Sequence, residues 1–414
     1  MSKNVAFPLP VAGMDMLSDQ TSLVKGAVRD AVNVDIGRGG TIECRGGFSR
    51  IVADPTMHSL WSAAQKGWVL LAKGSTLYRL NTTTYETTAL MSLGSAHPVS
   101  YTEYNGNIYF TNKHTVGWVP SDSTAARVVG VPTPAAPTLS ASAGGLLPGK
   151  YAVTISLLDD RGEEGGACEV QFLDLPAGGG IRLSNLPEIA GWSIAVYVSP
   201  ADGDMLHFNV EIPAVFSAYT VGEQSNGSEC GTQYLVPLPP GDFIRWFNGR
   251  LYTAANGTLK FSEAMRPHLH NPAYGVIPFS GHIAFVEPVA GGIFVGDSRG
   301  VWFLGGGDPT KFDFKLVSTH RAVAKSSISI PAANLPEKFA KIDMPIALWL
   351  SEAGYVAGMP DGTVSELQSD RIRLTKGLTG RTTFLMRKGR KQIVTPVNST
   401  STTVIGTAVD SDIP

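Results

Sequence analysis

Residues 291–317 have the sequence GGIFVGDSRGVWFLGGGDPTKFDFKLV, which shows most clearly the pattern on which the chain is built. Apolar residues form two short runs at 293–295 and 301–303, and a Gly- and Asp-containing turn separates them. A second turn, GGGDP, precedes a third run. This pattern predicts a strand, a tight turn, a strand, a loop and a strand. One such unit cannot bury its apolar face alone, so the chain needs copies of it.

Weaker copies of this unit recur along the chain. Aligning their first apolar runs gives one equivalent residue in each copy: Val69, Ile108, Leu251, Ile293, Val356 and Ile393. The steps between these positions are 39, 143, 42, 63 and 37 residues. Three steps lie near about 40 residues, the length of a four-stranded propeller blade. The sequence therefore predicts an all-β fold with a β-propeller of about six blades, and closure with five or seven blades stays open.

The long step indicates an inserted domain. It exceeds one blade by about 100 residues, the size of an immunoglobulin domain. Pro-rich segments at 132–137 and 237–240 bracket the extra residues and predict hinges. We expect an immunoglobulin- or fibronectin-like β-sandwich at 133–238, inserted between propeller segments 51–132 and 239–414.

Residues 1–50 are expected to contribute to the propeller and to docking. Apolar residues alternate through 32–36 and 42–44 across a Gly-rich turn, which predicts a hairpin with its apolar side inward. Four polar residues of this segment are candidates for docking to a neighbouring subunit: Arg29, Asn33, Asp35 and Arg45. Solvated charge at a strand edge is the simpler interpretation of the two arginines.

Composition narrows the class of protein. The 46 glycines, 27 prolines and 16% charged residues suit a turn-rich all-β chain. A formal net charge of −2 provides no basic field for binding nucleic acid by charge neutralisation. DNA could still pass by such a protein without being held. The start of the chain has no signal-like apolar core, and no run approaches a membrane span, so we expect folding in the cytosol.

Motifs for catalysis or metal binding are weak. His268 and His270 would lie on one side of a strand, but no carboxylate has a suitable ligand spacing beside them. The acidic turn at 159–164 is compatible with a calcium loop or a glycosidase carboxylate pair, although a solvated turn is simpler. No phosphate-binding loop appears. We predict no enzyme activity, catalytic residue, cofactor or metal.

Three cysteines, Cys44, Cys168 and Cys230, are an odd number without close spacing, which indicates neither a disulfide framework nor a zinc site. A Cys168–Cys230 bridge inside the inserted sandwich is conceivable. Buried free thiols are the simpler expectation.

Two stretches near the N-terminus, AVRDAVNVD (27–35) and RGGFSR (45–50), resemble virion proteins of short-tailed bacteriophages. In that family R-x-A-x-N-V-D and R-x-G-F strands introduce a propeller. The segments LKFSE (259–263) and PHLHNP (267–272) look like the family's central blades. Residues 143–164 resemble the immunoglobulin-like or fibronectin-like modules that phage structural proteins carry.

The resemblance implies a tail nozzle, in which six copies form a ring below the portal and its adaptor. Such a ring encloses the DNA exit channel and carries fibres, spikes or a needle. It would retain the packaged genome and conduct double-stranded DNA during ejection without sequence-specific binding. The expected location is the virion tail, after synthesis in the host cytoplasm. This chain is shorter than the large nozzles of that group.

Loops that combine glycine with large side chains are candidates for the channel gate, at 266–274 and 305–312. The polar residues singled out in them are Arg266, His268, His270, Asp308 and Lys311. Acidic or neutral loop faces would favour sliding of the phosphate backbone, whereas constricting loops would hold packaged DNA.

Two other function classes stay open. A carbohydrate-binding propeller that recognises a host cell surface would need exposed aromatic residues in a groove. The strand patterns instead predict core positions for six tryptophans: Trp61, Trp68, Trp118, Trp246, Trp302 and Trp349. A hydrolase propeller would need convergent carboxylates, and the 35 acidic residues are scattered through turns.

Overall fold

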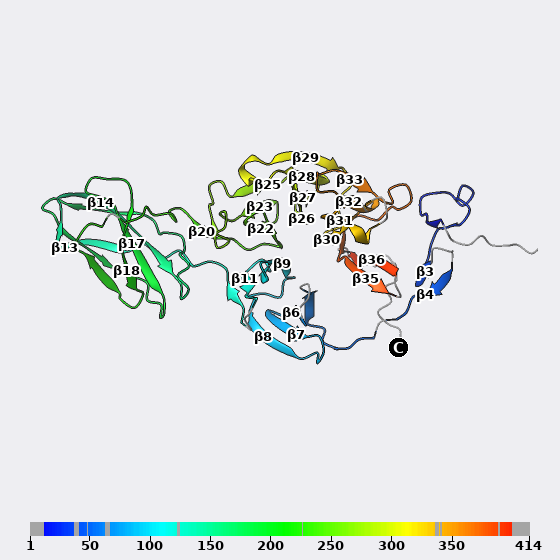
Figure 1. The fold of residues 1–414 in the computed structure, drawn as a ribbon, viewed down its shortest axis with the longest axis horizontal. Helices are drawn as coiled ribbons and strands as arrows, with labels where there is room; N and C mark the ends of the chain where they lie inside the picture. The colour runs from blue at the N-terminus through cyan, green and yellow to red at the C-terminus, as the bar shows by residue number, and fades with distance from the viewer. Residues whose placement is uncertain are drawn as a thin grey trace, which may run out of the picture. The chain divides into compact units, whose positions relative to one another are not determined.

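The computed structural model describes residues 12–36, 41–47, 49–62, 67–121, 125–225, 227–335, 339, 342–387 and 390–399. The described residues form strands and two short 3-10 turns, η1 (Pro309–Lys311) and η2 (Ala332–Asn334), which confirms the all-β prediction (Figure 1). No helix in this part of the chain has the length and apolar character needed to cross a lipid bilayer.

The chain divides into two compact units. The first comprises Met1–Met57, Asn256–Thr258 and Pro278–Pro414, and the second comprises His58–Ala255 and Leu259–Ile277. Both units contain four-stranded sheets in which strands that follow one another along the chain are neighbours. We call these meander sheets.

Three meander sheets involve the second unit. The first contains β5 (Met57–Trp61), β6 (Trp68–Lys73), β7 (Thr76–Asn81) and β8 (Thr87–Ser92). The second contains β9 (Ser100–Tyr104), β10 (Asn107–Thr111), β11 (Val116–Val119) and β12 (Arg127–Val128). The third contains β21 (Phe243–Phe247), β22 (Arg250–Ala255), β23 (Thr258–Phe261) and β25 (Val276–Pro278). Apolar clusters join the first sheet to the second and the second to the third.

The tight turns of the second and third sheets follow directly from their Asn-Gly dipeptides. Asn105 and Gly106 have φ values of 53° and 75°, and Asn248 and Gly249 have 43° and 78°. Two successive residues at positive φ match the right-handed twist of a hairpin, and Asn-Gly is the pair that adopts them most readily. These two turns fix the register of β9 with β10 and of β21 with β22.

Two further meander sheets lie in the first unit. One contains β26 (Phe285–Val289), β27 (Gly292–Gly296), β28 (Val301–Gly305) and β29 (Asp313–Ser318). The other contains β30 (Ile328–Pro331), β31 (Pro345–Ser351), β32 (Gly354–Gly358) and β33 (Val364–Glu366). A shared aromatic core packs them together, with the Phe285 and Phe294 rings 5.2 Å and 5.4 Å from Trp349.

Four of the six aligned repeat positions lie on equivalent buried strands, whereas Val356 lies on a different strand and Ile393 is half-buried on β36 (Arg390–Val394), which belongs to a two-stranded sheet. Val69, Ile108, Leu251 and Ile293 are buried on the second strand of their sheets. Val356 is also buried, but it lies on β32, the third strand, so the expected equivalence was wrong there by one strand. Alternation alone cannot distinguish neighbouring strands of a meander, because each has the same period of two.

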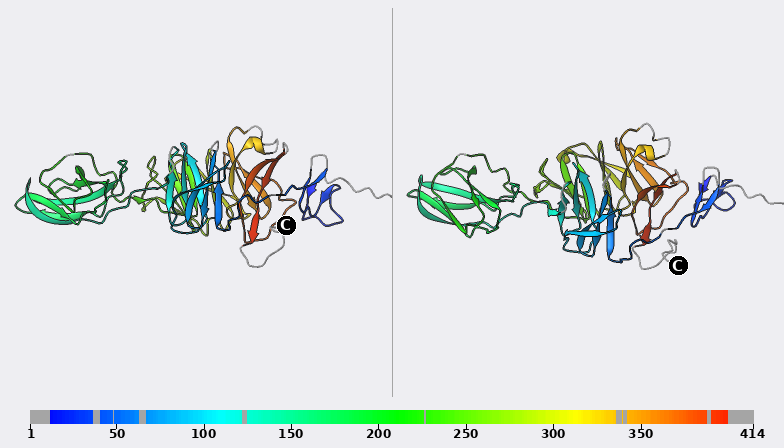
Figure 2. Two further views of the ribbon diagram at one scale, coloured as in Figure 1. Left: turned by 90° about the horizontal axis from the view of Figure 1, so that it is seen from below. Right: turned by 60° about the horizontal axis from the view of Figure 1, so that its bottom comes forward.

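The part of the chain that follows the second meander sheet and precedes the third forms two further sheets, which pack face to face. One has the order β13 (Thr138–Leu146), β16 (Gly179–Ser184), β19 (Ala218–Val221). The other has the order β15 (Gln171–Leu175), β14 (Gly149–Leu158), β17 (Ser193–Val198), β18 (His207–Pro213). Buried residues from both sheets form one core, so this segment is a β-sandwich, seen from two further directions in Figure 2.

Short two-stranded pairs complete the described chain. In the second unit β20 (Val236–Pro237) pairs with β24 (Leu269–His270). In the first unit β34 (Leu378–Gly380) pairs with β37 (Val397–Ser399), and β35 (Thr383–Arg387) with β36 (Arg390–Val394). Near the N-terminus β1 (Gly13–Met14) runs parallel to β2 (Ala27–Val28), and β3 (Val34–Ile36) is antiparallel to β4 (Ile42–Cys44).

The N-terminal hairpin forms, but its apolar side is not inward. Val32 is 63% exposed and Ile42 is 59% exposed, and every residue of β4 is exposed. The hairpin is two-stranded in the described chain, and two strands alone cannot bury an apolar face. The expected inward side was therefore wrong for the single chain.

Two expectations about core residues change. Only Trp349 of the six tryptophans is fully buried, and the other five are half-buried. All three cysteines are free, so the conceivable Cys168–Cys230 bridge is absent. Cys168 is buried in the sandwich core, where its carbonyl accepts a 2.8 Å hydrogen bond from Thr154 Oγ1.

Candidate functional site

The acidic turn after β14 is the centre of a joint between the sandwich and the meander sheets of the second unit. Asp159 Oδ1 accepts hydrogen bonds from the backbone N–H groups of Arg161 and Glu163, both at 2.9 Å. The Arg161 guanidinium binds Asp159 Oδ2 at 2.6 Å and Glu163 Oε2 at 2.7 Å. Burial alone would raise the pKa of Asp159, but these hydrogen bonds outweigh it and the pKa is lowered. The turn is thus an organised structure rather than the solvated turn expected.

Glu164 draws together three parts of the chain. Its Oε1 accepts hydrogen bonds from Ser156 Oγ at 2.6 Å, Tyr197 Oη at 2.8 Å and Thr232 Oγ1 at 3.1 Å. Ser156 and Tyr197 belong to strands of the sandwich, whereas Thr232 lies on the segment that returns from it. Burial first, and then the hydrogen bond to Glu164, raises the pKa of Tyr197 far above its ordinary value.

His268 connects this turn to the segment before β24. Its Nε2 lies 3.1 Å from the carbonyl oxygen of Glu164, so Nε2 carries a hydrogen and donates it. Its Nδ1 lies 2.8 Å from Glu163 Oε1, close enough for an ion pair but bent away from hydrogen-bond geometry. Both nitrogens face acceptors, and the side chain is only 13% exposed. His268 therefore connects the acidic turn to the segment before β24 and is largely covered within the chain.

Two more contacts tie the turn to the second meander sheet. The Arg161 guanidinium carbon lies 5.1 Å from the Trp118 ring centroid, a cation–π contact. Arg127 Nη1 on β12 binds both oxygens of Asp160 at 3.0 Å and 3.1 Å. The Arg127–Asp160 pair is about half exposed, so it contributes little stability and mainly fixes orientation.

Behind Trp118 the rings form a row. Tyr109 lies 6.3 Å from both Trp118 and Trp246, with interplanar angles of 20° and 23°. Trp246 stacks on Tyr104 at 3.6 Å. This row runs from the second meander sheet to β21 of the third, so the joint is backed by two sheets.

Two glycines of the acidic-turn segment pack closely against the two chain segments that connect the sandwich to the rest of the second unit. A Cβ on Gly165 would lie 2.8 Å from the carbonyl oxygen of Val131, and one on Gly166 would collide with the carbonyl of Leu235. Val131 is itself buried in the sandwich core. The Pro-rich connections were expected to be hinges, but the chain beside each is held against the joint.

The other four predicted gate residues differ in how far their side chains are exposed to solvent. His270 is 2% exposed and its Nδ1 is 2.8 Å from the Phe261 carbonyl oxygen, so it belongs to the core and not to a channel surface. Arg266 is exposed, with Nη1 3.3 Å from the Gly231 carbonyl oxygen. Asp308 caps η1, and its Oδ2 lies 3.7 Å from the exposed Lys311 Nζ. Arg266 lies in the second unit, whereas Asp308 and Lys311 lie in the first.

The structure brings together three of the four predicted docking residues. Arg45 Nε binds Asp35 Oδ1 across the N-terminal hairpin at 3.2 Å, and the Arg45 N–H donates to the Asn33 carbonyl at 2.9 Å. Arg29 is exposed and reaches the Met16 carbonyl at 3.5 Å. The sequence interpretation missed that seven large apolar side chains of the N-terminal segment are exposed: Met16, Leu17, Val24, Val32, Ile42, Ile51 and Val52.

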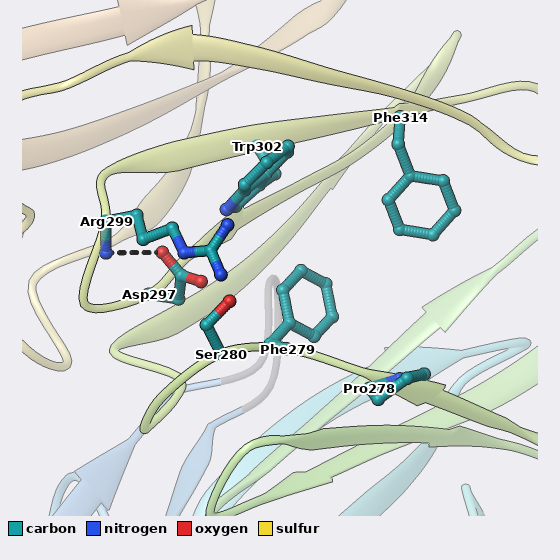
Figure 3. A pocket seen from close by; sticks show the side chains of 7 residues that line it. All are labelled: Pro278, Phe279, Ser280, Asp297, Arg299, Trp302 and Phe314. Carbon is teal, nitrogen blue, oxygen red and sulfur yellow. Dashed lines mark hydrogen bonds between the residues drawn. The ribbon is translucent and has the colours of Figure 1, made fainter.

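The first unit also contains a small cavity that the sequence interpretation missed. Its volume is about 140 Å³, and Figure 3 shows the side chains around it. They come from the end of β25 and the segment after it, and from the meander sheet of β28 and β29: Pro278, Phe279, Ser280, Asp297, Arg299, Trp302 and Phe314. Among the described residues, no group of three or more His, Cys, Asp and Glu side chains is placed to hold a metal ion.

No protein-family model matches this chain, and no curated protein matches it. Solved structures give faint likenesses. The N-terminal domain of Nup159 is 10% identical, with 82% of this chain and 73% of that chain covered and a TM-score of 0.27. The AfRom2 CNH domain is 8% identical, with 78% and 92% covered and a TM-score of 0.24. PorZ, a surface component of the type-IX secretion system of Porphyromonas gingivalis, is 12% identical, with 87% and 53% covered and a TM-score of 0.22. Likenesses this faint carry no argument about function.

Proposed function

We propose that this chain is a structural subunit of a bacteriophage tail, a nozzle ring around the DNA exit channel below the portal adaptor. The observation that supports the proposal is the exposure of seven large apolar side chains among the described residues between 16 and 52. Where exposed apolar side chains gather into a patch, they mark a protein–protein interaction site. The occupant that we assign to this surface is a neighbouring copy of the same chain.

Charge supports that assignment. The hairpin presents Arg45 beside Asp35, with Arg29 exposed on the adjoining strand segment. Charges of both signs near exposed apolar side chains are suited to the polar rim of an interface. The phage resemblance of residues 27–35 and 45–50 falls on this same surface.

The finer fold is part of the proposal. Meander sheets that pack one after another are what propeller blades require, and the sandwich leaves the chain between two of them. We infer a propeller of about six blades with an immunoglobulin-like insert, the weakest blade built from β34–β37. The strand order of the insert differs from the ABED and CFG sheets of an antibody constant domain, so the likeness lies in its two-layer architecture.

The proposed partners follow from the ring. Six copies would meet the portal adaptor on one side and fibres, spikes or a needle on another. DNA would pass through without sequence-specific contacts, as the net charge of −2 favours release over retention by charge. In this proposal the mechanism depends on rigid architecture and on the position of the loops.

Cryo-electron microscopy of the native particle that contains this chain tests the proposal. We expect a six-fold ring around an axial channel next to the adaptor, with residues 16–52 against the neighbouring copy. A peripheral position without an axial channel, or a ring in which residues 16–52 face solvent, would overturn it.

Carbohydrate binding is the second candidate function. The observation that favours it is the aromatic-lined cavity in the first unit, where Phe314 is 46% exposed. This activity is compatible with a place on the outside of a tail.

A further inference from the structure

The cavity beside β28 and β29 has a polar end with two unsatisfied atoms. Asp297 is 3% exposed, and its Oδ1 accepts the N–H groups of Arg299 at 2.7 Å and Gly300 at 3.2 Å. Its Oδ2 has no hydrogen-bond partner within the described residues, and neither does Trp302 Nε1. A buried acceptor and a buried donor thus lie unpaired beside one small space. Leaving such groups unpaired is costly, so a ligand that pairs both is favoured.

The charges at this end select a neutral ligand. Figure 3 shows the Arg299 guanidinium reaching over the polar end near Asp297 and Trp302, with the Ser280 hydroxyl opposite. A carboxylate disfavours an anionic ligand and a guanidinium disfavours a cationic one. A neutral group that both donates and accepts hydrogen bonds satisfies Asp297 and Trp302 together, and hydroxyl groups do this.

The other end of the cavity is apolar. Phe279, Phe314 and Pro278 line it, and Phe314 and Pro278 are exposed at its mouth (Figure 3). A pyranose ring has hydroxyl groups on its edge and C–H groups on its face, which matches a cavity with one polar end and aromatic walls. An amide side chain would satisfy the polar end but would leave the aromatic walls without an apolar face.

We propose that this cavity binds a single neutral sugar residue, with its hydroxyl groups on Asp297 Oδ2 and Trp302 Nε1 and its C–H face against Phe279 and Phe314. The volume of about 140 Å³ is below that of a drug-sized ligand site, so one ring fits and the rest of a glycan stays outside. Asp297 Oδ2 and Trp302 Nε1 are both covered in this structure, so the proposal requires the exposed Arg299 side chain to move aside when the ring binds. This site does not depend on the nozzle proposal.

Nuclear magnetic resonance of the full chain tests the site, with the Trp302 indole N–H signal assigned by Trp302→Phe. The probes are methyl glycosides of glucose, galactose, mannose and N-acetylglucosamine. We expect at least one to shift that signal with a Kd in roughly the millimolar range. Failure of all four to shift it, or a shift caused by N-acetylglycinamide instead, would overturn the assignment to a neutral sugar.

Variants separate the site from general stability. Trp302→Phe keeps an aromatic six-membered ring but removes the indole N–H donor. We expect this variant to bind the sugar about 10-fold or more weakly, measured by ligand-observed saturation transfer. Phe314→Ala changes an exposed residue and should weaken binding to a similar extent without unfolding the chain. Leu316→Ala is the matched control, because Leu316 is 41% exposed on the same strand and does not line the cavity. Equal affinity for Phe314→Ala and Leu316→Ala would refute the site.

Discussion

Glu164 shows how much one side chain organises in this protein. Its carboxylate oxygen is bound by two hydroxyl groups of the sandwich and by Thr232, and its backbone carbonyl is bound by His268. Residue 268 is 104 positions away along the chain. The acidic turn had a plausible interpretation as solvated charge, since spacing along the sequence does not show that a histidine, a tryptophan and an arginine from elsewhere meet it. Residue types identified the turn, but only the fold could assign its role.

His270 predicts a dependence of stability on pH. Burial lowers the pKa of His270, against the smaller effect of its hydrogen bond to Phe261. The unfolded chain binds a proton near its ordinary value of about 6.5, so it binds more protons than the folded chain below that pH. The free energy of unfolding should therefore fall as pH drops below about 6.5.

Thermal unfolding of His270→Asn, compared at roughly pH 7.5 and pH 5, checks this. The amide can keep the hydrogen bond to the Phe261 carbonyl but does not titrate, so the decrease in Tm on acidification should be smaller than in the parent chain. His97→Asn, at an exposed histidine, is the control and should keep the parent's decrease. If the Tm of His270→Asn decreases on acidification as much as that of the parent chain, groups other than His270 cause the decrease.

Gly166 is the residue at which the joint has least room. A Cβ there meets the Leu235 carbonyl, which is backbone and cannot move aside cheaply. Gly166→Ala should destabilise the joint by about 2 kcal/mol and increase cleavage of segment 132–137 in limited proteolysis. Gly222→Ala is the control in the same domain, since its nearest neighbour would be 3.9 Å away. Equal cleavage of the two variants would contradict the clamped connection.

At the scale of elements, local chemistry made the meander sheets predictable. Alternating apolar residues and Asn-Gly turns act within a few residues, so the strands that carry Ile108 and Leu251 could be located from sequence. The slip at Val356 arose because neighbouring strands share the same pattern. The N-terminal hairpin was also located from its alternation, but alternation alone does not show whether either side is covered. The cavity could not be predicted, because it combines residues from separate strands.

The Asn105–Gly106 turn gives a prediction at this scale. Gly106 has φ of 75°, and a Cβ there would lie 3.2 Å from Ser121 Cβ. Gly106→Ala should destabilise the second meander sheet by about 1–2 kcal/mol, seen as a lower Tm. Gly67→Ala should have little effect, because its Cβ would meet nothing within 4 Å and its φ is not positive. Equal Tm changes in the two variants would argue against the turn as a determinant.

At the scale of the whole molecule, the proposed ring predicts an assembly defect when exposed apolar side chains near the N-terminus are changed. Val32→Asp with Ile42→Asp should leave the Tm of the isolated chain nearly unchanged, because both side chains are already exposed. Incorporation of the variant into particles that lack their own copy should fall at least about tenfold, as for loss of an interface hot spot.

Quantitative mass spectrometry of purified particles measures that incorporation. Val215→Asp, at a 56% exposed residue of the sandwich, controls for the added charge and should be incorporated normally. Normal incorporation of the Val32 and Ile42 variant would show that this surface is not covered by a neighbouring copy.

The close contacts of Gly165 and Gly166 with the two segments that lead into and out of the sandwich have a mechanical consequence. A domain inserted on two loose tethers swings freely and dissipates a pull applied to it. Here both tethers are pinned beside the acidic turn, and Arg161 and His268 fasten that turn to the sheets. The sandwich is therefore a lever arm, and a load on its outer end reaches the sheet of β11 as torque.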